Sequence, residues 1–539
     1  MRTVNKLCRI RRRTVKVLER DTNLLIGALC IIFAITLFWC VKKSDMFIDE
    51  VYTYGLSNSY YAPFIKDTTE DGTLINRLLT QADFREYLSV SEGEAFSFDS
   101  VYYNQTQDAH PPLYYMILHF VCSFFVGSYS KWLGLTINIL FYLISNLLLY
   151  KVGTLILRSR SAAVLAVLLY ATSREGLSTA LMVRMYILMT LLTVLYLWIV
   201  LRLYQGDSSK IYYPLVTGVL FLGLFTQYFF VIFAFFISAV FCLHELKEKH
   251  IKRCIYYAIS AFSGIGIFYI SYPYILKHLF ADTLVSGKTV VSNVNDPAGM
   301  RLSIYSFIMQ TAANYKLALL ILLAAVAAGM IFQRKRIRMY ITEFDIRDSS
   351  ALAMILAVTF TVILIAVVAP VTALRYIDNV LPFVSLGIVY FAEILWRGKQ
   401  KYSLLFLGIC MVLCCIQGIR TMPLYVKTIP DKTYEIIRQY TELPCVYLDD
   451  DYNHPITKHM LLLMNFPEVY VTNDFLNTET QMYLEEKDIS EGIVLFIDIS
   501  KQKSGYDAKE VLQTIADKTG CQYKTLDDNS QPIYLLYGI

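Results

Sequence analysis

The chain has 539 residues, of which 56% are hydrophobic and 17% are charged, and its formal net charge is +5 at pH 7. Soluble proteins rarely have this composition, and many apolar runs reach the roughly 18 residues needed to cross a bilayer. These long uninterrupted runs exclude a β-barrel, and the positive charges cluster at their ends, so the sequence predicts a polytopic α-helical membrane protein that binds no nucleic acid.

The N-terminal segment combines basic residues with an apolar run. Residues 1–23 contain "NKLCRIRRRTVKVLER", and Leu24–Val41 is long enough to span a membrane. A basic segment before a full-length apolar run is typical of an uncleaved first helix whose N-terminus stays in the cytoplasm. We therefore expect a cytoplasmic N-terminal segment followed by a first transmembrane helix.

A transmembrane module is expected over residues 24–421, with a polar outer loop at 42–130. After the first helix, apolar runs lie near 112–126, 131–152, 161–173, 185–204, 212–225, 228–244, 254–276, 308–332, 351–369, 376–396 and 402–421. Short polar or basic loops separate them.

The last segment, 422–539, has a different pattern. Short β-type runs such as "CVYLDDD" and "GIVLFIDIS" alternate with helical patterns such as "DAKEVLQTIADKTG". That alternation predicts a small α/β domain, and we expect it to be extracytoplasmic. Cys445 and Cys521 both lie in this segment and are candidates for a disulfide.

The basic loops decide which apolar runs cross the membrane. Four loops are strongly basic, at 151–160, 246–253, 333–338 and 396–401. If every run crosses, all four fall outside, against the positive-inside rule, whereas all four become cytoplasmic if the run after His110 does not cross. Two prolines open that run, and proline is well tolerated at a helix start. We therefore expect a juxtamembrane or re-entrant helix at 111–126 and about eleven transmembrane helices.

Two adjacent carboxylates, Asp49 and Glu50, follow the first apolar run by a few residues. They could supply a general base and a ligand for a metal or a sugar. The alternative is a solvated helix start, where the helix dipole favours acidic residues. The sequence leaves both interpretations open.

Asp108 and His110 precede the prolines in "DAHPPLYY" and could face the same way in an extended segment. They could bind a cation or a phosphate, or they could orient an acceptor. The alternative is an exposed polar start to a helix that begins with proline.

Two arginines lie near the outer ends of later spans. Arg184 follows the polar junction that contains Glu175, and a charge at that depth is costly unless it is paired or faces a cavity. Arg184 could therefore face a phosphate, or its side chain could extend to the interface. Arg375 precedes Tyr376 in a similar position, and Asp378 could simply neutralise it.

Two other outer segments supply further candidates. Lys288 lies in the long loop 277–306, and long loops of this kind are often functional lids. Tyr228 lies in a short turn and could contact a sugar, although such tyrosines are more often interface anchors. The spans lack the broken helix pairs with a central acid that are typical of secondary transporters. We therefore expect any chemistry at the outer surface.

Four motifs occur in an order that resembles the GT-C membrane glycosyltransferases, specifically the family 39-like group of protein O-mannosyltransferases and aminoarabinose transferases. They are "IDE" after the first helix, "DAHPPLYY" after the outer loop, "RMYILM" after two further spans and "RYIDNVLP" late in the chain. The resemblance covers roughly residues 24–420 and does not extend to the C-terminal segment.

The resemblance implies transfer of a sugar from a polyprenyl-phosphate donor. Asp49 would be the general base that deprotonates the acceptor, and Glu50 would support it or bind the acceptor. Arg184 and Arg375 would bind the donor phosphate, and Lys288 of the long loop is our further candidate for the same role. Asp108 and His110 would shape the site or bind the acceptor, and Tyr186, Tyr228 and Tyr376 are our further candidates for that role. A single direct displacement would invert the anomeric centre.

Some relatives place an aspartate that helps to bind metal where this chain has Glu175, which leaves metal dependence open. No cofactor is certain, and a divalent cation held by Asp108 and His110 is the one candidate.

We therefore expect a multi-pass glycosyltransferase of the plasma membrane that uses a polyprenyl-phosphate sugar in the membrane lipid. It would transfer the sugar to a hydroxyl or amine of a glycan, lipid or protein acceptor at the outer face. Two alternatives remain. A transporter or flippase of lipid-linked saccharide would need polar residues at mid-membrane depth, and a non-catalytic scaffold would only display the C-terminal domain.

Overall fold

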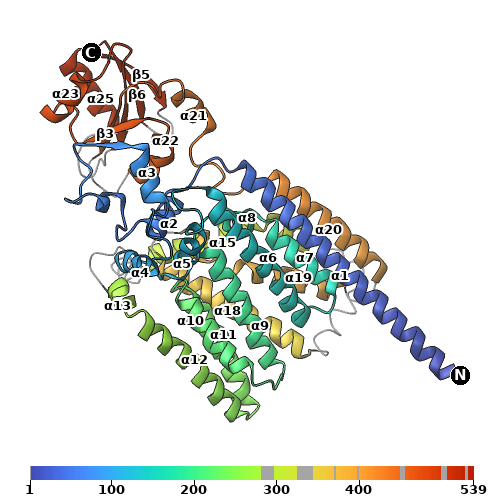
Figure 1. Ribbon diagram of the computed structural model, residues 1–539. Coiled ribbons are helices and arrows are strands. Elements are labelled where there is room, and N and C mark those ends of the chain that lie inside the picture. Colours follow the sequence, from blue (N-terminus) through green and yellow to red (C-terminus); the bar gives the residue numbers. More distant parts are fainter. Residues whose placement is uncertain are drawn as a thin grey trace. The chain divides into compact units, whose positions relative to one another are not determined.

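The computed structural model of the chain describes residues 2–280, 296–323, 344–369, 372–396, 400–449, 456–498, 507–527 and 532–538. Contacts within the chain define two compact units, whose elements are labelled in Figure 1. The helical unit comprises Met1–Val41, Ala109–Tyr114 and Leu135–Leu424, and the sheet unit comprises Lys42–Asp108, Tyr115–Gly134 and Tyr425–Ile539.

This division differs from the boundary expected from the sequence, which places the loop 42–130 with the transmembrane module and 422–539 on its own. Most of that loop instead belongs to the same unit as the C-terminal segment. The physical reason is strand β1 (Arg77–Thr80), which pairs antiparallel with β3 (Glu468–Thr472).

The helical unit is built from helices that run back and forth along one another. They are α1 (Arg2–Lys42), α6 (Lys131–Ile156), α7 (Arg160–Ala171), α8 (Arg174–Leu181), α9 (Tyr186–Tyr204), α10 (Tyr212–Leu224), α11 (Phe230–Lys247), α12 (Ile251–Ser271), α13 (Ile275–Phe280), α15 (Pro297–Asn314), α18 (Ile346–Val368), η2 (Leu374–Tyr376), α19 (Leu381–Trp396) and α20 (Gln400–Arg420).

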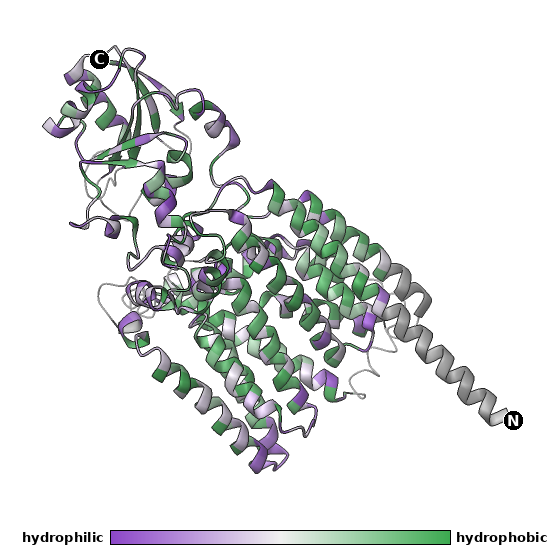
Figure 2. Cartoon of the chain, viewed as in Figure 1, coloured by the Kyte–Doolittle hydropathy of each residue, from purple (hydrophilic) through white to green (hydrophobic). Residues whose placement is uncertain are grey.

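Six helices among the described residues are long and apolar enough to cross a membrane, namely Thr22–Lys42 of α1 together with α6, α9, α11, α12 and α18. A seventh candidate is the pair Pro297–Asn314 and Lys316–Leu323, which is bent by 76°. Figure 2 shows hydrophobic residues along most of these helices. The chain is therefore a polytopic α-helical membrane protein, as predicted. The total of about eleven spans stays a prediction, because α5, α7, α10, α19 and α20 have shorter apolar segments.

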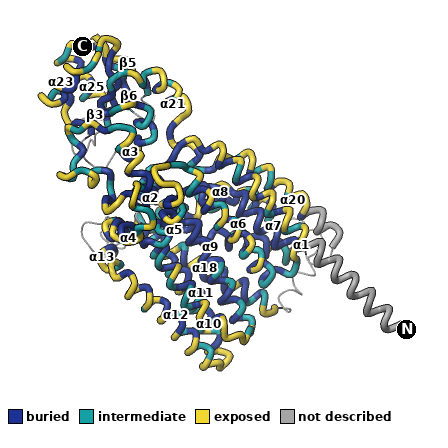
Figure 3. Tube along the Cα trace, in the orientation of Figure 1, coloured by how far each residue is buried: buried dark blue, intermediate teal, exposed yellow. Residues whose placement is uncertain are grey.

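Helix α9 lies at the centre of the helical unit. It packs against α10, α11 and α18, and 83% of its span is buried, compared with 22% for α12 (Figure 3). A helix that is buried on all sides is expected to be apolar on all sides, and the sequence of α9 fits this rule. Helix α7 is buried from Ser161 to Ala171 and packs against α19 and α20.

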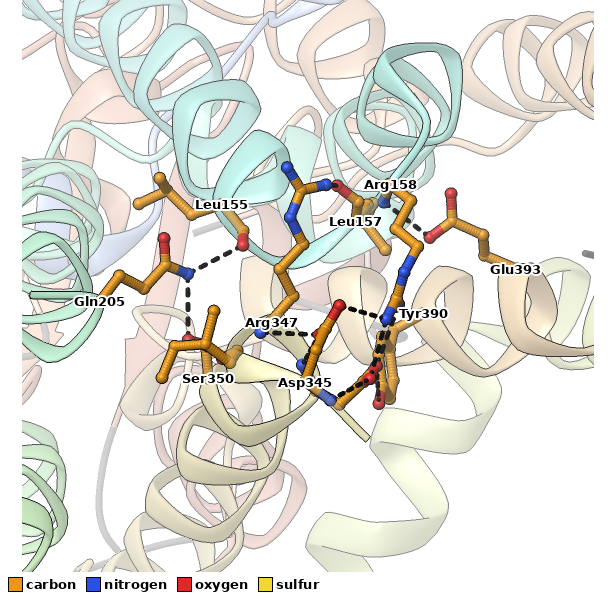
Figure 4. Close-up of polar contacts among 11 residues, drawn as sticks. Leu155, Leu157, Arg158, Gln205, Asp345, Arg347, Ser350, Tyr390 and Glu393 are labelled. Atoms are coloured by element: carbon orange, nitrogen blue, oxygen red, sulfur yellow. Dashed lines mark hydrogen bonds and ion pairs between the residues drawn. The ribbon is translucent and has the colours of Figure 1, made fainter. Parts of the chain in front are cut away.

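Charged side chains tie one end of the helical unit together (Figure 4). The guanidinium of Arg158, just after α6, donates to Asp345 Oδ2 at 2.7 Å and to the two carboxylate oxygens of Asp348 at 2.9 and 3.1 Å. Glu393 on α19 accepts the backbone N–H groups of Arg158 at 2.9 Å and Ser159 at 2.7 Å. We call Arg158, Asp345, Asp348 and Glu393 the end network. It joins the end of α6, the start of α7, the start of α18 and the last turns of α19.

Two of the four basic loops are fully described, whereas the loop 333–338 and residues 397–399 of the loop 396–401 lie outside the described residues. The loop 151–160 contributes Arg158 itself, and Arg253 of the loop 246–253 donates to Leu203 O at the last turn of α9 at 2.5 Å. Gln205, directly after α9, donates to Leu155 O in the last turn of α6 at 2.9 Å, so both loops lie at the same end of the helices. The side of the membrane that this end faces stays a prediction.

Helix α5 (Leu113–Cys122) is the apolar run that the charge argument removes from the spans. Its ten residues extend for about 15 Å, about half of a bilayer core. At its start, Leu113 N–H donates to Phe225 O and Tyr114 OH donates to Asn138 Oδ1, two turns into α6. The chain therefore enters α6 near the level at which α5 began, which fits a helix that does not cross.

The sheet unit contains a six-stranded sheet of order β1-β3-β2-β4-β6-β5. Its other strands are β2 (Cys445–Asp449), β4 (Ile493–Asp498), β5 (Gln522–Asp527) and β6 (Ile533–Tyr537). β3, β2 and β4 are parallel, and the remaining pairs are antiparallel. β2 is buried at all five residues, as expected for an inner parallel strand with near-continuous apolar sequence.

The sheet unit also contains two groups of helices. From the loop come α2 (Ile48–Asn58), η1 (Ile65–Thr68), α3 (Gln81–Leu88), α4 (Phe98–Gln107) and the greater part of α5, and from the C-terminal segment come α21 (Asp431–Ile437), α22 (Ile456–Leu463), α23 (Thr478–Glu485) and α25 (Ala508–Thr519). Leu512 and Ile515 of α25 pack with Leu495 and Leu536 of the sheet. Cys445 and Cys521 are buried free thiols, so the disulfide considered from the sequence is not formed.

Candidate active site

The acidic pair lies in the first turn of α2, in the sheet unit. Asp49 is half-buried, whereas Glu50 is completely buried. Glu50 Oε2 accepts a hydrogen bond from Lys43 Nζ at 2.8 Å and another from Phe47 N–H at 2.8 Å. The second bond satisfies an N–H group at the start of α2, where a carboxylate is favourable. Glu50 therefore fixes the helix turn that carries Asp49, and it is not the solvated residue of the alternative interpretation.

Asp108 also belongs to the sheet unit. It is half-buried and follows the last residue of α4, with an extended backbone at φ −97° and ψ 178°. An extended backbone at this point agrees with the expected lead-in to the two prolines.

His110 and Arg184 come together in the helical unit. Arg184 is 95% buried in the connection between α8 and α9, and its Nη2 lies 3.5 Å from His110 Nδ1. Because a guanidinium can only donate, this contact is favourable when His110 is neutral and carries its proton on Nε2. Two residues expected from separate motifs are thus neighbours. Tyr186, two residues after Arg184, is buried in the first turn of α9.

A chain of hydrogen bonds holds the connection that carries Arg184. Tyr114 OH donates to Asn138 Oδ1 at 2.7 Å, and Asn138 Nδ2 donates to Met182 O at 2.6 Å and to Ala180 O at 3.2 Å. Arg184 N–H in turn donates to Met182 O at 2.8 Å. The tyrosine of "HPPLYY" therefore positions the arginine of "RMY" through the amide of Asn138.

The other predicted residues of the helical unit form two aromatic contacts. The guanidinium carbon of Arg375 lies 5.6 Å from the ring centroid of Tyr376, and that ring packs edge-on against Phe229 at 5.4 Å. Tyr228 OH lies 2.8 Å from His278 Nδ1 at the start of the long outer loop. Lys288, the remaining phosphate-binding candidate, lies outside the described residues.

Two buried carboxyl groups flank Thr179 on α8. Thr179 Oγ1 lies 2.8 Å from Glu175 O and 2.7 Å from Asp378 Oδ2. Burial raises the pKa of Glu175 to about 7, and the positive charge of Arg174 offsets part of that rise. Burial, and then the negative charge of Glu175, raise the pKa of Asp378 well above its usual range. Neither residue lies in a candidate span.

Asp378 makes no ion pair with any residue in the part of the chain that the structure describes. The interpretation that it simply neutralises Arg375 is therefore not supported, although the charge of Arg375 does lower the pKa of Asp378 to a smaller extent. Asp378 instead binds α8.

No group of three or more His, Cys, Asp and Glu side chains among the described residues could hold a metal ion. A divalent cation bound by Asp108 and His110 stays a prediction.

Sequence reasoning missed Thr179, Asn138, Tyr114 and the partnership of Tyr228 with His278. Asn138 did leave a signal, since it is one amide in the apolar run "LGLTINIL", and a polar group inside a span usually has a specific partner. Nothing in the sequence indicated the role of Thr179, because threonine is common on short helices.

Comparisons with known proteins agree with this architecture. Residues 109–272, a little under a third of the chain, match the family model described as dolichyl-phosphate-mannose-protein mannosyltransferase. The crystal structure of ArnT from Cupriavidus metallidurans bound to undecaprenyl phosphate is similar with a TM-score of 0.51 and 10% identity, covering 96% of this chain and 98% of ArnT. The archaeal oligosaccharyltransferase AglB from Archaeoglobus fulgidus, in complex with an inhibitory peptide and a dolichol-phosphate, gives a TM-score of 0.45 and 12% identity over 89% of this chain and 70% of AglB. No curated protein matches the chain by sequence.

The chain therefore has the GT-C fold of membrane glycosyltransferases. Within that class, residues 109–272 carry the match to the dolichyl-phosphate-mannose-protein mannosyltransferase family. The resemblance predicted from the four motifs is confirmed.

Proposed function

We propose that the protein transfers a sugar from a polyprenyl-phosphate donor to an acceptor hydroxyl or amine. The observation that carries the proposal is the family match over residues 109–272, which includes both His110 and Arg184. These residues belong to different motifs and are neighbours in the structure. The GT-C fold supports the same class of reaction.

Arg184 is the proposed binding group for the phosphate of the donor. A guanidinium forms strong paired hydrogen bonds with phosphate oxygens, and burial strengthens such bonds. A neutral His110 beside it can orient the guanidinium without cancelling its charge. Arg375, stacked beside Tyr376, and Lys288 are proposed to act on the same phosphate.

Asp49 is the proposed general base. It would take the proton of the acceptor as the acceptor oxygen or nitrogen bonds to the anomeric carbon. The bond from that carbon to the phosphate oxygen would break in the same step, and the polyprenyl phosphate would leave with the bonding electrons. One such displacement inverts the anomeric centre. Glu50 is proposed to hold the turn of α2 and not to react, because Lys43 and Phe47 already occupy its Oε2.

A polyprenyl phosphate is the proposed carrier because ArnT, which shares the fold, was crystallised with undecaprenyl phosphate. Phosphate on a lipid is already a reasonable leaving group, so the enzyme needs charge stabilisation and a base more than a strong acid. Asp108, Tyr186 and Tyr228 are proposed to shape the site.

The proposal is tested with purified protein in nanodiscs and polyprenyl-phosphate sugars labelled in the sugar. Transfer or hydrolysis should be detected, and Asp49→Asn should reduce it to background because an amide cannot accept the proton. Asp71→Asn is the matched control, since Asp71 is an exposed carboxylate of the same unit that pairs with Arg77. Undiminished turnover in Asp49→Asn would contradict the role of Asp49, and no turnover of any polyprenyl-phosphate sugar would contradict the function.

For the orientation, we propose a plasma-membrane protein with a cytoplasmic N-terminus, the end network in the cytoplasm and the sheet unit outside. The six long helices, the bent pair and four of the five shorter ones, all except α5, would supply eleven spans. A cysteine introduced at Ser128 should then react with a membrane-impermeant reagent added to intact cells. Labelling of that cysteine only after the cells are opened would contradict this topology.

A further inference from the structure

One surface of the sheet unit presents a cluster of exposed aromatic rings. It is formed by residues between Val90 and Lys131, at the start of α4 and the end of α5. We call this cluster the aromatic tip, and its members are Phe96, Phe98, Phe120, Phe124, Phe125 and Val126. Each residue is between 36% and 62% exposed. Exposed apolar clusters of this kind usually mark a contact surface.

The rings of the aromatic tip are arranged against one another. The centroid of Phe96 lies 5.9 Å from that of Phe120 and 5.3 Å from that of Phe124, and Phe120 and Phe124 are 5.2 Å apart. Phe98 packs against the buried His119 at 5.7 Å. Because every member of the tip is at least 36% exposed, these contacts leave apolar surface of each residue open to a partner.

The backbone at Phe96 is held in an unfavourable conformation. Its φ is +62°, in the left-handed region that bulky residues rarely adopt. Two hydrogen bonds stabilise this turn, from Phe96 N–H to Ser123 Oγ at 2.9 Å and from Phe98 N–H to Phe96 O at 2.9 Å. Strained residues persist where the surroundings fix them, and they often serve a function. Here the strained residue carries a phenyl ring that remains 43% exposed although it packs against Phe120 and Phe124.

The aromatic tip lies close in sequence to the start of a candidate membrane span, and this position indicates that lipid covers it. Gly127 N–H donates to Val90 O at 2.8 Å, and four residues later Lys131 begins α6, a candidate span. Lys131 Nζ lies 5.4 Å from the ring of the half-exposed Trp132, and this pair of residue types is typical of the membrane–water interface. Val126, the last residue of the tip, precedes Lys131 by five residues, which reach at most about 18 Å.

We propose that the aromatic tip inserts into the lipid interface of the membrane on the side where α6 begins. Phenyl rings without hydroxyl groups suit the boundary between head groups and acyl chains, and the tip ends five residues before α6 begins. Glu92 and Asp99 are exposed acids near the rings, so the surrounding charge favours head groups that present ammonium groups. The tip then fixes the loop, and α4 with it, against the membrane.

The experiment uses quenching of tryptophan fluorescence by brominated lipids in nanodiscs. Phe124→Trp places an indole in the tip, and Tyr523→Trp places one on the exposed strand β5 as the control. The emission added by Phe124→Trp should fall at least twofold when the acyl chains are brominated, whereas that added by Tyr523→Trp should not change. Phe120→Trp repeats the test if Phe124→Trp fails to fold.

The proposal is overturned if the added emission is not quenched. If the unquenched emission is also blue-shifted and the protein is dimeric in the nanodisc, a second copy covers the tip instead of lipid. The expected result does not depend on any enzymatic activity, so it stands apart from the test of the proposed function.

Discussion

At Thr179 a single hydroxyl group meets two oxygen atoms, Glu175 O and Asp378 Oδ2. The hydroxyl has one hydrogen, and a backbone carbonyl can only accept it. A hydroxyl that donates to both oxygens shares its one hydrogen between them, whereas two full hydrogen bonds form if Asp378 Oδ2 carries a proton and donates to Thr179. The raised pKa of Asp378 agrees with this arrangement. We therefore expect the carboxylic acid to act as a neutral donor that joins α8 to the connection before α19.

This hydrogen-bond direction predicts the effect of substitutions at Asp378. Asp378→Asn should be tolerated, because the amide can donate to Thr179 as the protonated acid does. Asp378→Ala and Thr179→Val each leave a polar partner without its bond, and each should lower stability by about 1–3 kcal/mol. Thermal unfolding in detergent at pH 6 distinguishes the three variants. An Asn variant as unstable as the Ala variant would show that the acid is ionised.

Glu175 gives the protein a stability that depends on pH. Its pKa is raised from 4.5 to about 7 in the folded protein, so the folded chain keeps a proton that the unfolded chain releases. Stability should be greatest below pH 4.5 as far as Glu175 alone is concerned, and should fall as the pH rises through 7, by at most about 3 kcal/mol. The groups that face Glu175 are Arg174 on its own helix, Asp378 before α19, and Asn314 at the end of α15.

The measurement is the midpoint of thermal unfolding between pH 5 and pH 8. The wild-type midpoint should decline over this range, and Glu175→Gln should flatten the decline because glutamine does not titrate. Glu92→Gln is the control, since Glu92 is an exposed glutamate outside the helical unit. Equal slopes for wild type and Glu175→Gln would rule out this contribution.

At the scale of elements, the end network fixes four helices at one end of the bundle. Asp348 is completely buried, and Arg158 is its charged partner, so removing the guanidinium would leave a carboxylate buried without its cation. Arg158→Ala should lower stability by about 3 kcal/mol or more. Arg158→Lys should recover only part of this, because an ammonium cannot bind both carboxylates with the planar geometry of a guanidinium.

Unfolding in detergent again provides the readout for the end network. Arg301→Ala is the matched control, since Arg301 is exposed on α15. If Arg158→Ala unfolds at the same temperature as this control, the end network does not contribute to stability and the helices associate by packing alone.

The elements show what the sequence could and could not predict. Apolar runs of span length became helices, because the membrane leaves the backbone few alternatives. The charge of the loops also indicated that α5 is not a span, and its ten residues agree. Strand β1 was not predicted. The four residues "RLLT" show no clear alternation of apolar and polar residues. They form a strand only because they pair with the edge of β3.

The same limit applies to the candidate site. The sequence indicated several site candidates because a charged side chain near a span is energetically costly unless it is paired or functional. These candidates are His110, Arg184, Arg375 and the acidic pair. The partners of these residues could not be predicted. Asn138 and Thr179 are common residue types, and their roles depend on which helices pack together. The contact between His110 and Arg184 joins positions 74 residues apart, and spacing alone does not indicate it.

At the scale of the whole molecule, the loop after the first helix depends on the C-terminal segment. Asp45 accepts from Thr428 OH at 2.6 Å, from Ile429 N–H at 3.0 Å and from Tyr434 OH at 3.0 Å. β1 pairs with β3, and α2 contacts α22. A chain that ends at residue 421 loses all of these partners within the sheet unit.

We therefore expect the truncated protein to insert in the membrane with residues 42–108 unfolded. Limited proteolysis in nanodiscs should cut it after Lys66, Arg77 or Arg85, whereas the full-length protein should resist cleavage at these positions. Equal resistance of the two proteins would show that the loop folds by itself. The same truncation should also abolish glycosyl transfer, if Asp49 acts as proposed.

The pairing of β1 with β3 also has a consequence in time. Arg77 lies opposite Val471, about 390 residues later in the chain, and synthesis at 5–20 residues per second takes roughly 20–80 s to reach it. During that interval every membrane helix can insert. The acidic pair on α2, however, belongs to a loop whose partner strands in the C-terminal segment have not yet been made. A nascent chain would thus present Asp49 on α2 long before α22, which contacts α2, has been made. The last part of the protein to be made decides when the first part becomes competent.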